Sequence, residues 1–143
     1  MNAKDFCLKA HQGQVRRGWE EYSRHPMRVA AAVEAAGGSK EAICAAYLHD
    51  TVEDCGISLK EIEKGFGVRV MEIVDILSKK EGEKDHIERI LKSEDRDALL
   101  IKEKDLMDNL WVREGDYWPG MEDALRRYEV NLRRVREVLA LGG

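Results

Sequence analysis

The chain has 143 residues, of which 43% are hydrophobic and 36% charged, and its formal net charge is −4. This length and balance suit one globular domain with a proper core, and the mixed, slightly acidic charge argues against broad binding of nucleic acid or of a membrane surface. No apolar run reaches the ~20 residues that span a bilayer, and the first residues lack the apolar core of a signal peptide, so we expect a cytoplasmic protein.

The composition favours helix over sheet. Prolines number only 2, while Ala, Leu, Glu, Lys and Arg recur throughout, and no segment alternates apolar and polar residues as a half-buried strand would. We therefore predict an all-α helical bundle, a single domain over residues 1–143 with about seven or eight helices. The 3 cysteines lack C-x-x-C spacing and are expected to be reduced thiols.

The N-terminal segment is predicted to form two helices around a polar stretch. The first covers residues 3–12, and the polar stretch from Gln12 to Arg24 follows. Pro26 is predicted to begin the second helix, because proline is tolerated at the first helical position and pushes the preceding residue out of helical geometry. His25 is thus expected at the N-cap, and Gly37 and Gly38 end the helix.

The next helix is the most apolar in the chain. Ser39 is its expected N-cap, and the unbroken apolar run 42–48 leaves no solvated face, which predicts a central buried helix. Ser58 and Glu61 form a capping box that opens a short helix. Hydrophobic spacing and turn residues place the remaining helices at 58–65, 68–79, 83–92, 97–111 and 121–141.

Polar residues follow this apolar helix directly. His49 and Asp50 end it, and Glu53 and Asp54 come next. An ionised carboxylate is costly to bury unless it is paired or bound to metal, which favours a functional cluster here. Since residues four apart share a helical face, His49 is expected over Glu53 and Asp50 over Asp54. The alternative is a helix end that reaches solvent.

A second polar cluster lies on the amphipathic segment 97–111. Lys102, Asp105 and Asn109 are three and four residues apart, so they share one face of the helix. Alone, they would equally suit an exposed salt bridge between Lys102 and Asp105. Two histidines and two aspartates suit a divalent ion such as Mn²⁺, Fe²⁺ or Zn²⁺, which would activate water for attack on a phosphoryl group. Glu53 or Asp54 would orient that water or take its proton.

Taken in order, these motifs resemble the hydrolase domain of the RelA/SpoT family, a branch of the His-Asp (HD) phosphohydrolases. The resemblance covers about residues 8–111 and runs through Ala10-His11-x-Gly13-Gln14-x-Arg16-Arg17-Gly18, Tyr22-x-x-His25-Pro26-x-x-Val29-Ala30, Ala45-Ala46-x-Leu48-His49-Asp50-Thr51-Val52-Glu53-Asp54, Phe66-Gly67-x-x-Val70, Leu77-Ser78-Lys79 and Lys102-x-x-Asp105-x-x-x-Asn109-Leu110. Six ordered blocks are far more specific than a single His-Asp pair.

The resemblance implies an α-helical fold and Mn²⁺-dependent removal of the 3′-pyrophosphate from the guanosine nucleotides ppGpp and pppGpp. By position, it implies metal ligands at His25, His49, Asp50 and Asp105, an acidic pair acting on the nucleophilic water at Glu53 and Asp54, and substrate contacts at Arg16, Arg17, Lys102 and Asn109.

The chain also departs from the family pattern. Leu106 stands where an arginine is usual, and the residues after Trp111, a region that helps to close the nucleotide site in the family, do not match. Two other hypotheses therefore stay open: an HD phosphatase for another nucleotide or phosphate ester, and a binding module without turnover. His11 and His86 are expected to lie outside the site. The apolar face of the last helix permits a homo-oligomer.

Overall fold

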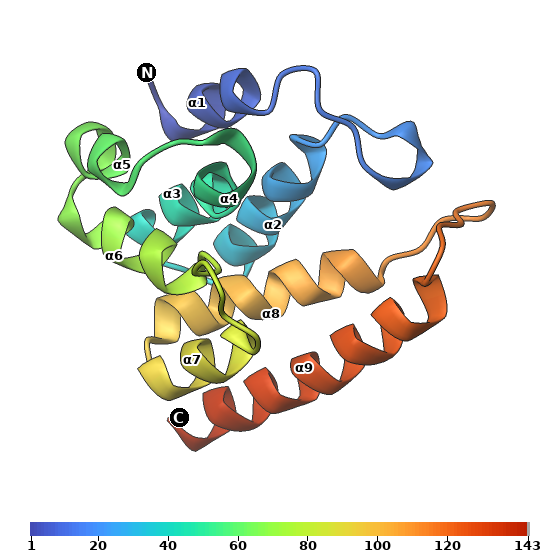
Figure 1. The fold of residues 1–143 in the computed structure, drawn as a ribbon. Helices are drawn as coiled ribbons and strands as arrows, with labels where there is room; N and C mark the ends of the chain where they lie inside the picture. Colours follow the sequence, from blue (N-terminus) through green and yellow to red (C-terminus); the bar gives the residue numbers. More distant parts are fainter. Residues whose placement is uncertain (143) are drawn as a thin grey trace.

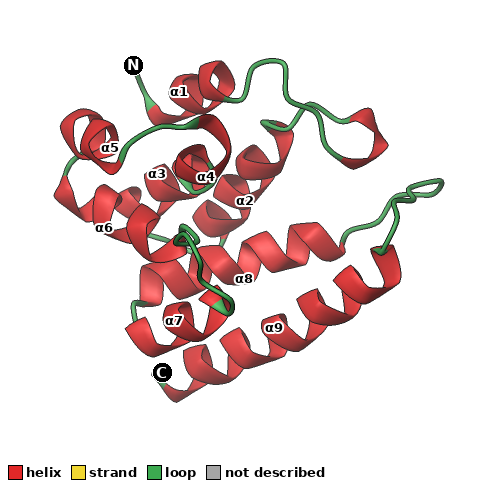
Figure 2. Cartoon of the chain, viewed as in Figure 1, coloured by secondary structure: helices red, strands yellow, loops and turns green. Residues whose placement is uncertain are grey.

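In a computed structural model, which describes residues 1–142, the chain folds into helices joined by short loops (Figures 1 and 2). Within these residues the backbone forms no strand, only an isolated antiparallel bridge between Val15 and Glu21. The all-α prediction is confirmed. The elements are α1 (Ala3–Ala10), the 3₁₀ turn η1 (Arg17–Trp19), α2 (Arg24–Ala35), α3 (Lys40–Leu48), α4 (Thr51–Cys55), α5 (Leu59–Phe66), α6 (Val68–Leu77), α7 (His86–Ser93), α8 (Arg96–Leu110) and α9 (Met121–Leu141).

Side-chain caps define the starts of several helices. The hydroxyls of Ser39 and Ser58 accept hydrogen bonds from the amides of Ala42 and Glu61, as the sequence predicted. Asp95 caps α8 in the same way, through the amide of Ala98. Each cap satisfies an amide that the first helical turn leaves without a partner.

The prediction that His25 occupies an N-cap is wrong. Helix α2 begins at Arg24, and Ser23 before it already has helical dihedral angles, so His25 lies inside the first turn. Pro26 is tolerated there because amides of the first turn have no intrahelical acceptor.

The apolar helix ends at Leu48, as expected, but a separate short helix follows. His49 and Asp50 form the break between α3 and α4, with Asp50 at φ −102° and ψ −3° as the N-cap of α4. Asp50 and Asp54 nevertheless keep the expected helical spacing, since the amide of Asp54 donates to the carbonyl of Asp50 at 2.9 Å. Gly56 closes α4 in the left-handed conformation, at φ +67°.

The core lies between α2, α3, α6 and α8, and the central role of α3 is confirmed. Ala42, Ala45, Ala46 and Leu48 of α3 are fully buried. Helix α9 runs beside α8 along one edge of the molecule, and α7 lies near the C-terminal end of α9 (Figure 1). Within residues 1–142 no helix is both long and apolar enough to cross a membrane.

Candidate metal centre

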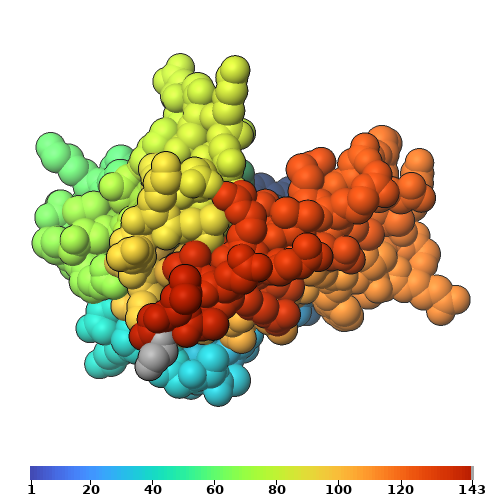
Figure 3. Space-filling view, turned by 90° about the horizontal axis from the view of Figure 1, so that it is seen from below, coloured from blue at the N-terminus to red at the C-terminus, as the bar shows by residue number. Residues whose placement is uncertain are grey.

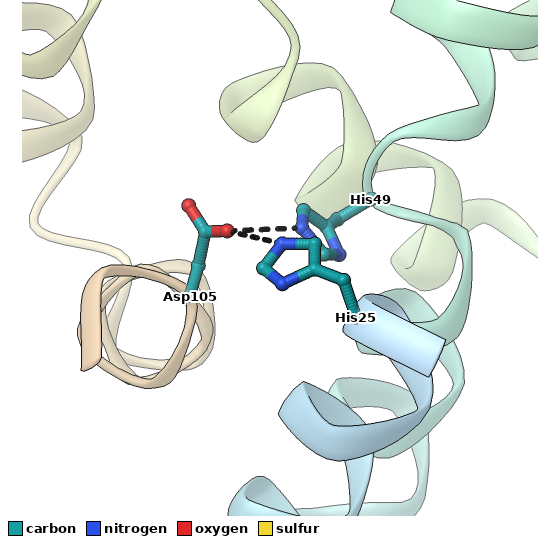
Figure 4. Close-up of side chains that lie close together, drawn as sticks. All are labelled: His25, His49 and Asp105. Atoms are coloured by element: carbon teal, nitrogen blue, oxygen red, sulfur yellow. Dashed lines mark hydrogen bonds and ion pairs between the residues drawn. The ribbon is translucent and has the colours of Figure 1, made fainter. Parts of the chain in front are cut away.

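Three side chains from three different helical segments converge in the interior. His25 comes from the first turn of α2, His49 from the end of α3, and Asp105 from the middle of α8, and all three are buried. Oδ1 of Asp105 lies 2.8 Å from Nε2 of His25 and 3.4 Å from Nε2 of His49. Figure 4 shows both imidazoles turned toward the same carboxylate oxygen.

Asp50 joins this group from the side of α4. Its Oδ2 lies 3.1 Å from Nε2 of His49 and 3.7 Å from Nε2 of His25. The hydroxyl of Tyr22 donates a 3.0 Å hydrogen bond to the same oxygen, which orients the carboxylate. The four residues expected to bind metal thus lie together around the two Nε2 atoms.

The hydrogen bonding of His49 leaves one of its nitrogens free for a ligand. Its Nδ1–H donates to the carbonyl of Ala46 at 2.6 Å, so the lone pair of the neutral ring is on Nε2. This Nε2 is buried and, within residues 1–142, has no aligned hydrogen-bond partner. A divalent cation would satisfy it, so the donor set of two imidazole nitrogens and two carboxylates fits a bound metal.

The charge balance of the cluster keeps its carboxylates ionised. Burial raises the pKa of Asp105, but the Lys102 ammonium beside it outweighs burial and holds that pKa well below its usual range. For Asp50, burial is outweighed by the charge that His49 carries when no metal is bound, and the pKa falls to about 2; a metal ion would take the place of the proton on Nε2 of His49. Both groups are therefore available as anionic ligands at neutral pH.

The two members of the acidic pair face different surroundings. Glu53 lines a small hollow of about 60 Å³ beside the cluster, and its Oε1 accepts a hydrogen bond from the backbone amide of Lys79. Asp54 is not part of that wall and lies on the side of Tyr22. Burial raises the pKa of both carboxyl groups, which makes each a better proton acceptor near neutral pH.

Lys102 and His86 also line the hollow. Lys102 Nζ lies 2.9 Å from Oδ2 of Asp105, so this cation faces the cluster as expected. His86, which was expected outside the site, begins α7 and lies on the wall of the hollow. His11, by contrast, is a buried packing residue stacked on Tyr22.

Three of the predicted substrate contacts lie together near the C-terminal end of α8: Arg16, Arg17 and Asn109. Arg16 Nη2 donates to Oδ1 of Asn109 at 3.0 Å. Arg17 donates to the carbonyls of residues 108, 109 and 111 and stacks on Trp118, with its guanidinium carbon 4.6 Å from the ring centre. In this structure Arg17 therefore satisfies free carbonyls at the end of α8.

Sequence reasoning missed Asp108, which hydrogen-bonds the other nitrogen of His25. Its Oδ2 lies 2.6 Å from Nδ1 of His25. The one signal in the sequence is its position three residues after Asp105, which puts both carboxylates on the same side of α8.

A comparison with family models matches residues 3–99 to the HD domain. This match covers more than half of the chain and includes His25, His49 and Asp50. The chain belongs to the HD domain family. The matched segment ends before Asp105, whose place in the site rests on the geometry of α8.

Curated relatives also show the resemblance to the RelA/SpoT family. The chain is 36% identical over 121 residues to a guanosine-3′,5′-bis(diphosphate) 3′-pyrophosphohydrolase of Aquifex aeolicus, covering 77% of this HD domain chain and 17% of the relative. It is 30% identical over 116 residues to the GTP pyrophosphokinase rsh of Brucella melitensis, covering 73% of the chain and 16% of the relative. These matches confirm the predicted resemblance to the RelA/SpoT family. The chain spans only a small part of the length of these relatives.

Solved structures share the fold. One, described as a metazoan ortholog of SpoT that hydrolyzes ppGpp and plays a role in starvation responses, superposes with a TM-score of 0.81 at 26% identity and covers 96% of this chain and 83% of its own. A protein from Listeria monocytogenes EGD-e superposes with a TM-score of 0.55 at 20% identity, covers 81% of this chain and 99% of its own, and is similar in fold alone.

Proposed function

We propose that this HD domain is a divalent-metal-dependent phosphohydrolase that removes the 3′-pyrophosphate from ppGpp and pppGpp. In the reaction, water adds to the phosphorus of the 3′-pyrophosphate that is bonded to the ribose oxygen, and that P–O bond breaks. With ppGpp the products are GDP and pyrophosphate. Mn²⁺ is the proposed metal, held by His25, His49, Asp50 and Asp105.

The observation that carries this proposal is the buried Nε2 of His49, which has no aligned hydrogen-bond partner within residues 1–142 and lies among two ionised carboxylates and a second imidazole. Such an arrangement without a cation leaves a buried polar atom unsatisfied, which is costly. When bound, the ion would supply positive charge that acidifies water and neutralises the phosphoryl group. Likeness to the SpoT ortholog that hydrolyzes ppGpp supports the choice of substrate.

A basic groove between α7 and α9 supports an anionic substrate. This groove, of about 570 Å³, is lined by Lys84, Asp85, His86, Ile87, Lys102, Arg126, Arg127, Val130, Asn131 and Arg134. Figure 3 shows this side of the molecule, with the segment before α7 projecting beside α9. His86 and Lys102 line both the groove and the metal-side hollow, so the two spaces adjoin.

Only some of the cations that line the groove are paired with carboxylates. Arg126 and Arg134 pair with carboxylates. Lys84 and Arg127, in the part of the chain that the structure describes, have no carboxylate within ion-pair distance and are free for phosphate oxygens. We assign this groove to the phosphate groups of the nucleotide, and assign the base to a second hollow lined by Arg16, Arg17, Trp118 and Tyr128.

The remaining residues bind and orient the substrate in this proposal. Lys102, beside the cluster, binds the reacting pyrophosphate, and Asn109 contacts the ribose or a phosphate. Glu53, on the wall of the hollow, orients the attacking water and takes its proton. Asp54 assists from the Tyr22 side.

The direct test is hydrolysis of ppGpp by metal-stripped protein resupplied with Mn²⁺, followed by separation of the nucleotides. We expect GDP and pyrophosphate, and no turnover by an Asp50→Ala variant. Hydrolysis of other phosphate esters in preference to ppGpp would replace the substrate and keep the reaction class. Mn²⁺ binding without hydrolysis of any nucleotide tested would contradict the enzymatic assignment.

A further inference from the structure

Asp108 contacts the metal cluster through His25 alone. His25 uses both ring nitrogens: Nε2 lies 2.8 Å from Oδ1 of Asp105, and Nδ1 lies 2.6 Å from Oδ2 of Asp108. The two carboxylates stand one helical turn apart on α8 and meet opposite edges of one imidazole. Asp105 is on the side of the cluster and Asp108 is on the far side.

Arg28, which lies on α2 together with His25, fixes the orientation of Asp108. Arg28 Nε donates to Oδ1 of Asp108 at 2.6 Å and its Nη2 donates to Oδ2 at 3.0 Å, a two-point contact. The two bonds from Arg28 hold the carboxylate in place with Oδ2 facing Nδ1 of His25.

Arg28 is itself held in place by further contacts. Nη1 and Nη2 of Arg28 donate to the two carboxylate oxygens of Glu20 at 2.9 and 2.7 Å, and Arg113 donates to Glu20 at 3.0 Å. The Arg28 guanidinium also stacks on Trp111, 4.8 Å from the ring centre. Because every hydrogen-bonding atom of the guanidinium has a carboxylate partner, Arg28 cannot turn without breaking several charge-assisted bonds.

We propose that Asp108 is a positioning residue of the metal centre, clamped by Arg28, which keeps the proton of His25 on Nδ1 and aims the Nε2 lone pair at the metal. A carboxylate hydrogen-bonded to a metal-bound imidazole fixes its tautomer and raises its basicity. This inference rests on the metal site of the proposed function, and it adds to that site a residue outside the ligand set.

The chain offers a matched control for the ion pair. Arg69 makes the same kind of two-point contact with Asp95, at 2.7 and 3.0 Å, near the opposite end of α8. Neither residue lines the metal-side hollow. Breaking this pair tests what the loss of a comparable ion pair does to the protein without touching His25.

The experiment measures Mn²⁺ affinity by calorimetry on metal-stripped parent, Asp108→Ala, Asp108→Asn and Arg69→Gln proteins, with urea unfolding of each metal-free form. We expect Asp108→Ala to weaken Mn²⁺ binding about 10–100-fold. Asp108→Asn should weaken it less, because the amide oxygen still accepts from Nδ1–H without supplying charge. Arg69→Gln should lower stability in urea and leave Mn²⁺ affinity unchanged.

The outcomes separate this inference from the proposed function. Parent-like Mn²⁺ affinity in both Asp108 variants would overturn the positioning role while leaving the metal site intact. An equal loss of affinity in Arg69→Gln would overturn it as well, since the effect would then follow from stability. If Asp108→Ala does not fold, Asp108→Asn carries the comparison. A parent that binds no Mn²⁺ would overturn the proposed function together with this inference.

Discussion

Replacing Glu53 by glutamine separates the handling of water from the binding of metal. Glu53 lines the hollow beside the cluster but is not among the four proposed ligands, and its Oε1 accepts a hydrogen bond from the amide of Lys79. A glutamine carbonyl can accept the same bond, so we expect the free energy of unfolding to change by no more than about 1 kcal/mol. Mn²⁺ affinity should stay within about threefold, or ~0.65 kcal/mol.

The expected loss of activity is much larger. A positioned general base contributes about 10²–10⁴-fold to rate, and glutamine cannot take a proton. At about 1.36 kcal/mol per decade, this corresponds to about 2.7–5.4 kcal/mol of lost transition-state stabilisation. The raised pKa of Glu53, caused by burial, favours the upper part of this range because a stronger base transfers a proton more readily near neutral pH.

The assay is the steady-state release of pyrophosphate from ppGpp at saturating Mn²⁺, alongside Mn²⁺ titration of the metal-free proteins. Glu63→Gln, an equal change of charge on an exposed position of α5, is the control and should match the parent. A Glu53→Gln variant with at least half of the parental kcat would contradict the role of Glu53 as the general base. So would loss of Mn²⁺ binding, which would make Glu53 a ligand rather than a base.

Three further results are expected. Arg127→Gln, which removes an unpaired cation from the groove, should raise KM for ppGpp about tenfold, or ~1.4 kcal/mol, with little change in kcat. The control is Arg133→Gln, which lies on the same helix but lines a different hollow and should change neither constant. Equal KM values in the two variants would contradict the binding of substrate phosphate in the groove. Mn²⁺ at about 100 times its Kd should stabilise the parent by about 2.7 kcal/mol in calorimetric unfolding, and a stabilisation that persists in His49→Ala would place the metal elsewhere. Gly38→Ala should destabilise the protein by about 1–3 kcal/mol in urea, because the added Cβ would lie 2.5 Å from Cγ1 and 2.9 Å from the carbonyl oxygen of Val33; unchanged stability would contradict this close packing.

Most of the helices and their order were predictable from the sequence, because helix formation depends on neighbours three and four residues apart. The last helix was predicted at 121–141 and is observed over Met121–Leu141. Ser39 and Ser58 cap the helices that they were predicted to cap. The unbroken apolar run before His49 correctly indicated the buried central helix.

The composition of the candidate site came from motif order, and its geometry came only from the fold. His25 and Asp105 are 80 residues apart, and no local rule brings them to 2.8 Å. The break at His49–Asp50 was equally hidden, since the sequence continues as a helix would.

The contacts that could not be predicted lie between helices. His86 reaches the hollow because α7 packs near α8, and Asp108 reaches His25 because α8 crosses the start of α2. Arg17 satisfies carbonyls at the end of α8 rather than facing solvent as a basic turn would. Sequence periodicity gives the face of a helix on which a side chain lies, but its partner depends on the packing angle and offset of the next helix, and these are set by the whole core.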